Sequence, residues 1–308
     1  PPPPPPLFQA EDGIRDPESC LVGSEMCIRD RCLTGPSPPL PDDLDGYPSP
    51  WLSGVLDPAA TEESILLGSR GCRASCPFCY TPAATGRRIR AHSVERVLED
   101  IEWVSRRGSG RLWFGDPNFS VSETRVRAIL EGILRRSLKV EMWIETRADM
   151  LDDELIRLAK RAGVTVIAMG LESAAGKVVP ALEKDLEPET IATASRKALG
   201  AGIDVELFSQ FALPGESFDD ALETLRFVKD CGVKIRGNSN AQQMQLYFGA
   251  EITDRPEDFG IRPLRESFPP WMSAGAEFET ERMSRAEIER VREAWRAESL
   301  DGGRRVIS

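Results

Sequence analysis

The stretch SILLGSRGCRASCPFCY, residues 64–80, carries the strongest signal in the chain. It begins with a short apolar run at residues 64–68, which predicts a β-strand. Cys72, Cys76 and Cys79 then follow at the spacing C-x3-C-x2-C. Three thiolates on one short loop can ligate three irons of a cubane cluster and leave the fourth iron without a protein ligand. A catalytic metal site requires such an open coordination position.

Strand and helix signals alternate after this loop. Ser93 caps an apolar helical repeat, Pro188 stands in the first turn of another, and Ser217 with Asp220 resembles a capping box. A further helix follows the box Ser284-x-x-Glu287 near the C-terminus. Strands are predicted at residues 64–68, 111–114, 139–146, 165–170, 205–213 and within 234–248. About six β-α units predict an α/β fold with a parallel sheet, helices outside, and ligands at the carboxyl ends of the strands.

Composition limits the classes of function. The 308 residues are 41% hydrophobic and carry a net charge of −11, which argues against a nucleic-acid partner and a membrane-surface partner. No apolar run reaches the roughly 20 residues that a membrane span needs. Seven cysteines, three of them clustered, make a poor disulfide framework and indicate a reducing, cytoplasmic location. His92 is the only histidine, so imidazole-rich metal sites and Ser-His-Asp catalysis lose their support.

The two ends of the chain differ from its middle. Residues 1–31 show no sustained apolar period, and the strings AEDGIRD and SEMCIRDR within them resemble translated sequencing-adapter sequence. We expect an artefactual leader at residues 1–31, which removes Cys20 and Cys27 as ligand candidates. A Pro-rich linker is expected at residues 32–60, the main domain at 61–250 and a C-terminal extension at 251–308.

At the cysteine loop and at several later strand ends, the sequence resembles the radical S-adenosylmethionine superfamily. The resemblance covers about residues 45–250 and implies a partial (β/α)6 barrel of the radical S-adenosylmethionine type. It implies a [4Fe–4S] cluster on Cys72, Cys76 and Cys79, which cleaves S-adenosylmethionine to a 5′-deoxyadenosyl radical that abstracts hydrogen from a substrate. It also implies a small-molecule or peptide substrate and an electron donor such as flavodoxin or ferredoxin.

The same resemblance gives roles in cofactor binding to residues around the strand ends. The aromatic residue before the third cysteine packs near the adenine, and the turn after the second strand meets the methionine amino group. Polar residues after the third and fourth strands contact the methionine or ribose portion, and a basic residue lies near the carboxylate. The residues at these positions are Phe78, Gly115, Asp116, Glu145, Arg147, Glu172, Ser173 and Lys184. Leu213-Pro-Gly-Glu216 is similar to the family's G-x-P-G-E turn, with Ala212 where glycine is usual.

Most of these residues also have a structural interpretation. Asp116 and Glu216 could be helix caps, Glu145 could pair with Arg147, and Phe78 could belong to the core. Glu172 is harder to explain in this way because it interrupts an apolar strand. A carboxylate there is costly unless it binds something, which favours a functional role.

A subgroup is indicated upstream of the cysteines. Residues 44–57 resemble the linker between a cobalamin-binding domain and a radical domain, which implies cobalamin-dependent methyl transfer in a longer protein that contains the missing domain. A cobalamin-independent radical enzyme, either a methylthiotransferase or an oxidative cyclase, is the second hypothesis. The third is a non-enzymatic domain stabilised by zinc, with His92 or Cys231 completing the ligand set.

Overall fold

The computed structural model describes residues 20–22, 25–28, 31–34, 42–235, 241–247, 249–264 and 278–299. The chain divides into two units, residues 1–42 and residues 43–308. In the first unit, three short antiparallel strands pair in sequence order: β1 Cys20–Val22, β2 Glu25–Ile28 and β3 Arg31–Thr34. These strands lie in the expected leader at residues 1–31, and β3 extends past its end at residue 31.

The second unit is built on a six-stranded sheet. Its order is β11-β10-β9-β8-β7-β4, and every neighbouring pair is parallel. Strands that are consecutive in the alternation of strands and long helices therefore lie side by side in the sheet. This order confirms the expected partial barrel of α/β type. The strands are β4 Ser64–Leu66, β7 Arg111–Phe114, β8 Glu141–Glu145, β9 Val164–Glu172, β10 Asp204–Phe211 and β11 Ala241–Gln243.

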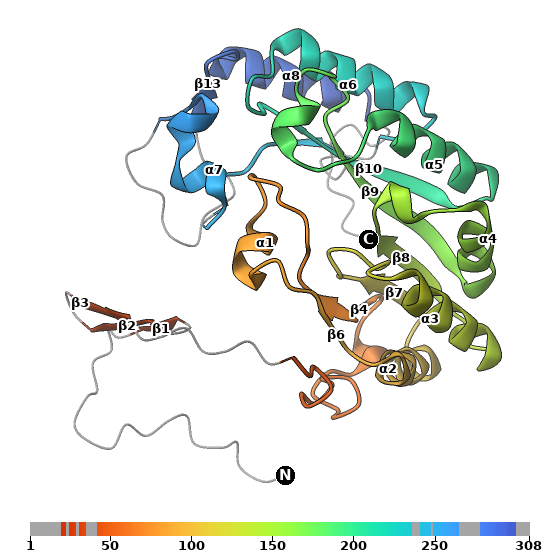
Figure 1. Ribbon diagram of the computed structural model, residues 1–308. Helices are drawn as coiled ribbons and strands as arrows, with labels where there is room; N and C mark the ends of the chain where they lie inside the picture. The colour runs from red at the N-terminus through yellow and green to blue at the C-terminus, as the bar shows by residue number, and fades with distance from the viewer. Residues whose placement is uncertain are drawn as a thin grey trace. The chain divides into compact units, whose positions relative to one another are not determined.

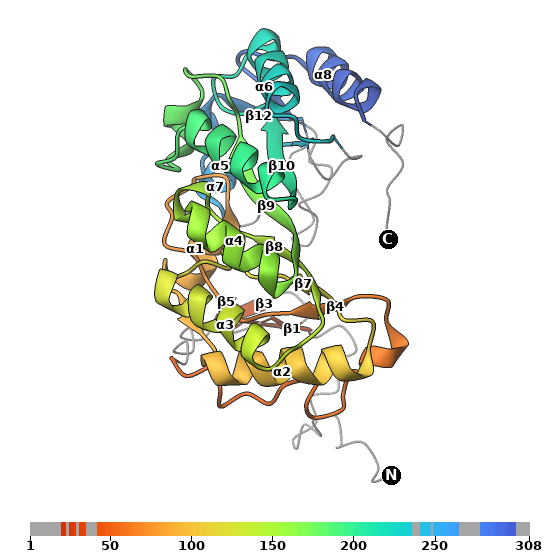
Figure 2. The same ribbon diagram turned by 90° about the vertical axis from the view of Figure 1, so that its right-hand side faces the viewer.

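Five long helices connect these strands and cover one face of the sheet (Figures 1 and 2). The Ser93 hydroxyl accepts from the Arg96 N–H at the start of α2, and Ser217 with Asp220 forms a capping box at the start of α6, as predicted. Short helical turns η2 Ala148–Met150 and η3 Val179–Leu182 lie between them. The five helices are α2 Val94–Arg107, α3 Glu123–Arg135, α4 Asp153–Ala162, α5 Pro188–Gly200 and α6 Phe218–Asp230.

The two faces of the sheet differ in burial. Along β10, alternate side chains are buried beneath the helices, whereas Glu206, Phe208 and Gln210 point to the opposite face and stay partly exposed. Trp113 and Trp143 share this inner face, with ring centroids 5.5 Å apart. The inner face is therefore where side chains remain accessible to a ligand.

Residues 43–60 pack onto this domain instead of forming a free linker. Trp51 is 5% exposed, and its indole N–H donates to the carbonyl of Ile65 over 3.2 Å. The hydroxyl of Ser49 donates to Asp100 on α2 over 2.5 Å. The short turn η1 Pro58–Ala60 then leads into β4. Most of the expected linker, residues 43–60, is thus part of the second unit.

The expected C-terminal extension also belongs to this unit. Its last helix begins at the predicted capping box of Ser284 and Glu287. The guanidinium of Arg290 lies 4.2 Å from the Phe218 ring centroid on α6, so this helix packs over the helical layer. The extension contains α7 Glu251–Asp254, η5 Pro256–Phe259, β12 Ile261–Pro263, β13 Phe278–Thr280 and α8 Arg285–Ala297. None of the helices in the described ranges has both the length and the apolar character of a membrane-crossing segment.

Candidate functional site

Residues 68–92 leave the sheet after β4 and return before α2; we call them the cysteine excursion. Its two ends are joined by a hydrogen bond from the His92 N–H to the Gly68 carbonyl, 3.0 Å long. Next to this bond, β5 Ser69–Arg70 pairs with β6 Arg90–Ala91. The helix α1 Tyr80–Thr85 forms its far side. Because β4 ends at the carboxyl edge of the sheet, the excursion lies at that edge.

Asp116 and Arg125 hold the neck of the excursion closed. Asp116 is 2% exposed, and its two oxygens accept from the Gly68 N–H over 2.6 Å and from the Ser69 hydroxyl over 2.7 Å. Arg125, on α3, donates to the carbonyls of His92 and Gly68 over 2.5 and 3.0 Å. Burial raises the pKa of Asp116, against the hydrogen bonds from Ser69 and Gly68, which lower it. These bonds fix where the excursion leaves the sheet.

Gly71, directly before the first cysteine, has no room for a side chain. A Cβ at this position would lie 1.9 Å from the carbonyl oxygen of Arg88, and φ is +99°. Both the close approach and the left-handed backbone require glycine. The two arms of the excursion can therefore pass each other only because residue 71 is glycine.

The three predicted ligands all lie on this excursion as free thiols. Cys76 is 8% exposed, and the Cys79 N–H donates to its carbonyl over 3.1 Å. Burial raises the pKa of Cys76 to about 11 and also raises that of Cys79. A thiolate in such surroundings needs a nearby cation, which bound iron would supply. The donor set therefore fits an iron–sulfur cluster.

The zinc hypothesis requires a site in which several side chains bind one metal ion. Within the described ranges, no three His, Cys, Asp or Glu side chains converge as ligands of one ion. Thiolates that bind three different irons of a cubane do not converge in that way. Of the candidates for a fourth zinc ligand, His92 contacts Asp45 over 3.0 Å, and Cys231 is buried at the C-terminal end of α6.

Glu172, Lys184 and Gln210 form a bonded set at the end of the inner sheet face; we call it the strand-end group. The Lys184 ammonium lies 2.8 Å from Glu172 Oε1 and also donates to the carbonyl of Gly170 over 2.7 Å. The Gln210 amide donates to Glu172 Oε2 over 2.7 Å. A Cβ on Gly170 would lie 2.2 Å from the Lys184 Nζ, so glycine leaves space for the ion pair.

Glu145 stands beside this group without a bonded partner. Its carboxylate makes no hydrogen bond or ion pair within the part of the chain that the structure describes. Burial raises the pKa of Glu145 to about 7, with Lys184 lowering it and Glu172 raising it. The alternative of a Glu145–Arg147 pair is not what the structure shows, because Arg147 pairs with Asp149 over 2.9 Å.

Two contacts bring the cysteine excursion and the strand-end group together. The Ser75 hydroxyl donates to the Glu183 carbonyl over 3.3 Å, and the neighbouring residue is Lys184. Arg147 donates to the Lys184 carbonyl over 2.9 Å and so fixes the same turn. Lys184 and Glu172 are also close enough to Cys76 to influence the pKa of its thiol. The cysteines therefore face the strand ends, as an active site at this edge requires.

Three further predicted residues, Phe78, Ser173 and Gly115, make their contacts outside the strand-end group. Phe78 is 8% exposed and packs in the hydrophobic core. Ser173 is fully buried, and its hydroxyl lies 3.2 Å from that of Thr224 on α6. Glu172 takes a positive φ of 62°, which ends the strand and turns the following residue toward the helices. Gly115 follows β7, where its N–H donates to the Leu66 carbonyl over 2.9 Å.

Neither suggested helix cap is one. The helix after Asp116 is capped by Ser122, and α6 is capped by Ser217. Glu216 is fully buried, and one of its oxygens accepts from the Leu213 N–H over 3.2 Å. Its other oxygen has no partner among the described residues. Burial raises the pKa of Glu216 to about 8.

Comparison with known proteins completes the description. The family model described as the Radical SAM superfamily matches residues 66–228. An uncharacterised methyltransferase of Pyrococcus horikoshii is 25% identical over 166 residues, which are 54% of this chain and 36% of that protein. The hopanoid C-3 methylase of Methylococcus capsulatus is 30% identical over 150 residues, 45% of this chain and 28% of that enzyme. The chain thus spans about a third of the length of these curated relatives.

A solved structure shares the fold. The radical S-adenosylmethionine methyltransferase TsrM from Kitasatospora setae, with cobalamin and a [4Fe–4S] cluster bound, aligns with a TM-score of 0.59 at 17% identity. The alignment covers 73% of this chain and 45% of TsrM. At this identity the likeness concerns the fold.

Proposed function

This chain belongs to the radical SAM superfamily, and we propose that it binds a [4Fe–4S] cluster through Cys72, Cys76 and Cys79 for the reductive cleavage of S-adenosylmethionine. When bound, the cluster supplies an electron that breaks the sulfonium C–S bond and yields methionine and a 5′-deoxyadenosyl radical, which abstracts hydrogen from a substrate. The observation that carries the proposal is the contact between the excursion and the strand-end group through Ser75 and Glu183.

The strand-end group has the chemistry to hold the methionine part of S-adenosylmethionine. Lys184 offers an ammonium for a carboxylate, and Glu172 and Glu145 offer carboxylate oxygens for an amino group or a ribose hydroxyl. Glu145 has its full accepting capacity free within the described residues, so it can bind without breaking an existing bond. Half-buried surroundings strengthen such contacts because water competes less.

We further propose that the reaction is a cobalamin-dependent methyl transfer. Supporting this are the methyltransferase and methylase names of the two curated relatives and the cobalamin bound in TsrM. A small-molecule or peptide substrate and a one-electron donor complete the proposal. A cobalamin-independent radical reaction is the competing outcome in the test below.

The cluster is tested by anaerobic reconstitution. Wild-type protein should bind about four irons, and Cys72→Ala, Cys76→Ala or Cys79→Ala should abolish cluster binding because each removes one iron ligand. The matched control is Cys231→Ala, which removes a buried thiol at the far end of α6 and should leave the iron content intact. Recovery of zinc without iron under strict anaerobiosis would contradict the proposal.

The methyl-transfer step is tested with two lengths of protein. This chain should cleave S-adenosylmethionine slowly. In equilibrium dialysis it should bind cobalamin weakly, because cobalamin is large and this chain alone would offer too little contact area to outweigh the entropy lost on association. A longer version recovered from the source DNA should bind cobalamin and transfer methyl groups. If the longer protein ignores cobalamin but still cleaves S-adenosylmethionine, the cobalamin-independent reaction is favoured.

A further inference from the structure

The segment that carries the three cysteines has little regular structure of its own. Residues 71–79 contain no helix or strand. Inside this segment, the Cys79 N–H donates to the Cys76 carbonyl over 3.1 Å, and the Ala74 N–H lies 3.5 Å from the Cys72 sulfur. A rigid cluster binds three thiolates well only when they are held close to fixed positions. Contacts with other parts of the domain must therefore supply most of the order that this segment needs.

One such contact comes from the C-terminal extension. The N–H of Ile252, in α7, donates to the carbonyl of Pro77 over 3.1 Å. Pro77 directly follows Cys76, so this bond fixes the chain between the second and the third cysteine. The Ile252 side chain is fully buried in the same hydrophobic core as Cys76. Its own packing therefore holds the donor of this bond in place.

A second contact joins two aromatic rings. Tyr247, which precedes α7, packs against Tyr80, with ring centroids 5.6 Å apart and ring planes tilted by 49°. Tyr80 directly follows Cys79 and begins α1. Tyr80 is 50% exposed, and a half-exposed ring has few neighbours that restrain it. The contact with Tyr247 therefore contributes a large share of the restraint on the chain after the third cysteine.

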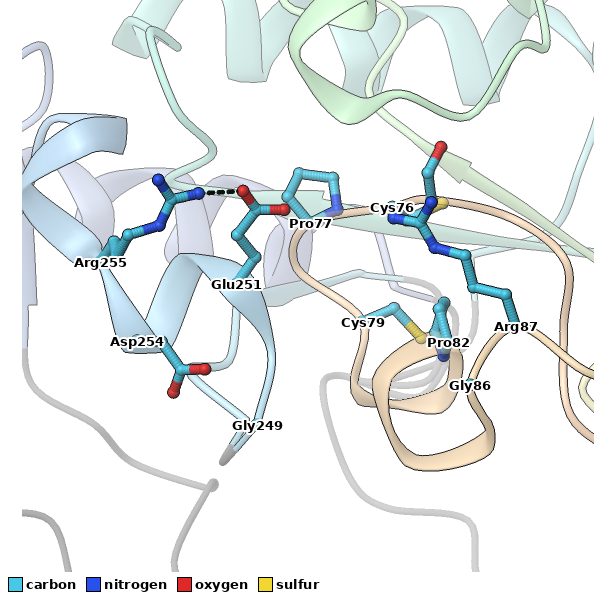
Figure 3. A pocket seen from close by; sticks show the side chains of 11 residues that line it. Cys76, Pro77, Cys79, Pro82, Gly86, Arg87, Gly249, Glu251, Asp254 and Arg255 are labelled. Atoms are coloured by element: carbon cyan, nitrogen blue, oxygen red, sulfur yellow. Dashed lines mark hydrogen bonds and ion pairs between the residues drawn. The ribbon is translucent and has the colours of Figure 1, made fainter. Parts of the chain in front are cut away.

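Around these contacts, a cavity separates the excursion from α7 (Figure 3). The cavity has a volume of about 690 Å³. Cys76 and Cys79 line one side, and Glu251 and Asp254 line the other. Because open space lies between these walls, packing across the cavity does not hold the two cysteines. The bond from Ile252 and the ring of Tyr247 are what fix the distance between the walls.

Both contacts come from outside the part of the chain that the family model matches. That match ends at residue 228, whereas Tyr247 and Ile252 lie beyond it. The extension thus adds support to a cysteine segment that the matched region contributes. A segment that is already ordered loses less conformational entropy when it binds a rigid cluster. Contacts that order the cysteines therefore also strengthen the binding of the cluster.

We propose that Tyr247 and Ile252 are positioning residues for the cluster, which brace the cysteine segment against the C-terminal extension and thereby slow the loss of the cluster. The inference rests on the proposed function, because it takes Cys72, Cys76 and Cys79 as the cluster ligands. The ring of Tyr247 makes the contact with Tyr80, so phenylalanine should be able to replace it.

Three variants of the full chain test the brace. Tyr247→Ala removes the ring that packs against Tyr80, whereas Tyr247→Phe keeps the ring and removes only the hydroxyl. The matched control is Phe227→Ala, which removes a partly buried ring from α6, outside both the excursion and the extension. The control measures what a general loss of packing does to the cysteines, and urea unfolding measures how large that loss is in each variant.

Hydrogen exchange followed by mass spectrometry measures the order of the cysteine segment without the cluster. In the cluster-free chain, the amides of residues 72–80 should exchange about 10-fold faster in Tyr247→Ala than in wild type, because the segment opens more often. Tyr247→Phe and Phe227→Ala should stay within about twofold of wild type. Equal exchange in wild type and Tyr247→Ala would overturn the proposal, as would exchange in Tyr247→Phe or Phe227→Ala as fast as in Tyr247→Ala.

Iron release then measures the effect on the cluster. After anaerobic reconstitution, an iron chelator should remove the cluster about 10-fold faster from Tyr247→Ala than from wild type, and the electron paramagnetic resonance spectrum of its reduced cluster should be broader. Tyr247→Phe should restore the wild-type rate and spectrum. Equal release from wild type and Tyr247→Ala would overturn the brace and leave the proposed function intact. If wild type binds no iron at all, the proposed function has failed and the role of the brace in retaining a cluster fails with it, whereas the exchange rates still show whether Tyr247 orders the segment.

Discussion

The neck of the cysteine excursion and the strand-end group lie at the same edge of the sheet, and each contains a carboxylate and a cationic side chain. At the neck, the chain itself occupies both oxygens of Asp116. In the strand-end group, Glu172 accepts from two side chains, and neighbouring Glu145 accepts from none in the described structure. The bonds of Asp116 come from a backbone N–H and a short hydroxyl side chain, whereas those of Glu172 come from the long side chains of Lys184 and Gln210, which can move aside for a ligand. Glu145 can accept from a ligand without any such rearrangement.

The difference has an energetic basis. Asp116 binds a backbone N–H and a hydroxyl that would otherwise be buried without partners, so its loss leaves several polar groups unsatisfied. Glu172 and Gln210 bind through flexible side chains that can rearrange around a cofactor. We therefore expect changes at the neck to affect folding and changes in the strand-end group to affect binding.

The largest effect is expected for Asp116→Ala. The change leaves the buried Gly68 N–H and Ser69 hydroxyl without their acceptor and removes a carboxylate whose charge favours the nearby Arg125, which together cost about 3–5 kcal/mol. The free energy of unfolding in urea should fall by that amount, and iron binding should be lost with the position of the excursion. Asp116→Asn keeps one acceptor and should recover part of both. Normal iron content in the alanine variant would show that the neck does not position the cysteines.

Glu216, in the turn between β10 and α6, tests the intermediate case of a carboxylate with one oxygen bonded and one without a partner in the described residues. Its pKa is raised from 4.5 to about 8 by burial, so between these values the folded protein keeps a proton that the unfolded chain has released. Stability should therefore fall as pH rises from about 4.5 to 8. At roughly 1.4 kcal/mol per pH unit, and with partial titration at each end of the range, the loss of stability amounts to about 4 kcal/mol.

The variant Glu216→Gln removes this titration. Urea unfolding at pH 5, 6.5 and 8 should give the variant a flatter stability profile than wild type, with similar stability at pH 5 and an advantage for the variant at pH 8. Comparison with wild type cancels the contribution of Glu145, whose pKa is also raised. Parallel profiles would mean that the buried oxygen finds a partner when charged.

A smaller effect, on binding, is expected for Glu172→Gln. The loss of one charge-assisted contact to S-adenosylmethionine costs about 1.5–3 kcal/mol, roughly 10- to 150-fold in affinity. Calorimetry on the reconstituted protein should show this loss with the iron content unchanged. Glu206→Gln is the matched control because Glu206 lies on the same inner face, where it accepts from the Trp143 indole over 3.1 Å. Equal affinities for wild type and Glu172→Gln would assign the carboxylate to the fold.

The sequence predicted the helix caps and the order of the strands better than it predicted the contacts between distant residues. The caps at Ser93, Ser217 and Ser284 and the order of strands were legible because each depends on residues close in sequence. The role of Asp116 was not legible, because its partners at Gly68 and Ser69 are nearly fifty residues away. The packing of Trp51 against β4 was missed because the proline-rich composition around it favoured a linker, although its partner Ile65 lies only 14 residues further along the chain.

The site was predictable in part. Glu172 was identified because a carboxylate in an apolar strand needs a reason, and the structure gives it Lys184 and Gln210 as partners. Gln210 was missed, although its inward direction follows from the alternation along β10. Arg125 left no local signal, because a helix surface often carries arginine and only the fold brings it to the neck.

The smallest effect is expected for Ala212→Gly, at the turn after β10. Ala212 has φ +62°, a left-handed conformation that costs a side-chain-bearing residue about 1–2 kcal/mol and glycine almost nothing. Against this gain, glycine loses a buried methyl worth about 0.8 kcal/mol and raises the entropy of the unfolded chain by about 0.5–1 kcal/mol. The terms nearly cancel, so urea unfolding should place the variant within about 1 kcal/mol of wild type. Gly71 at the neck also has a positive φ, but the Arg88 carbonyl fills the space beside it, so that position accepts only glycine. A large change at Ala212 in either direction would show that the β10 turn is as tightly constrained as the neck, and the distinction between the two regions would then fail.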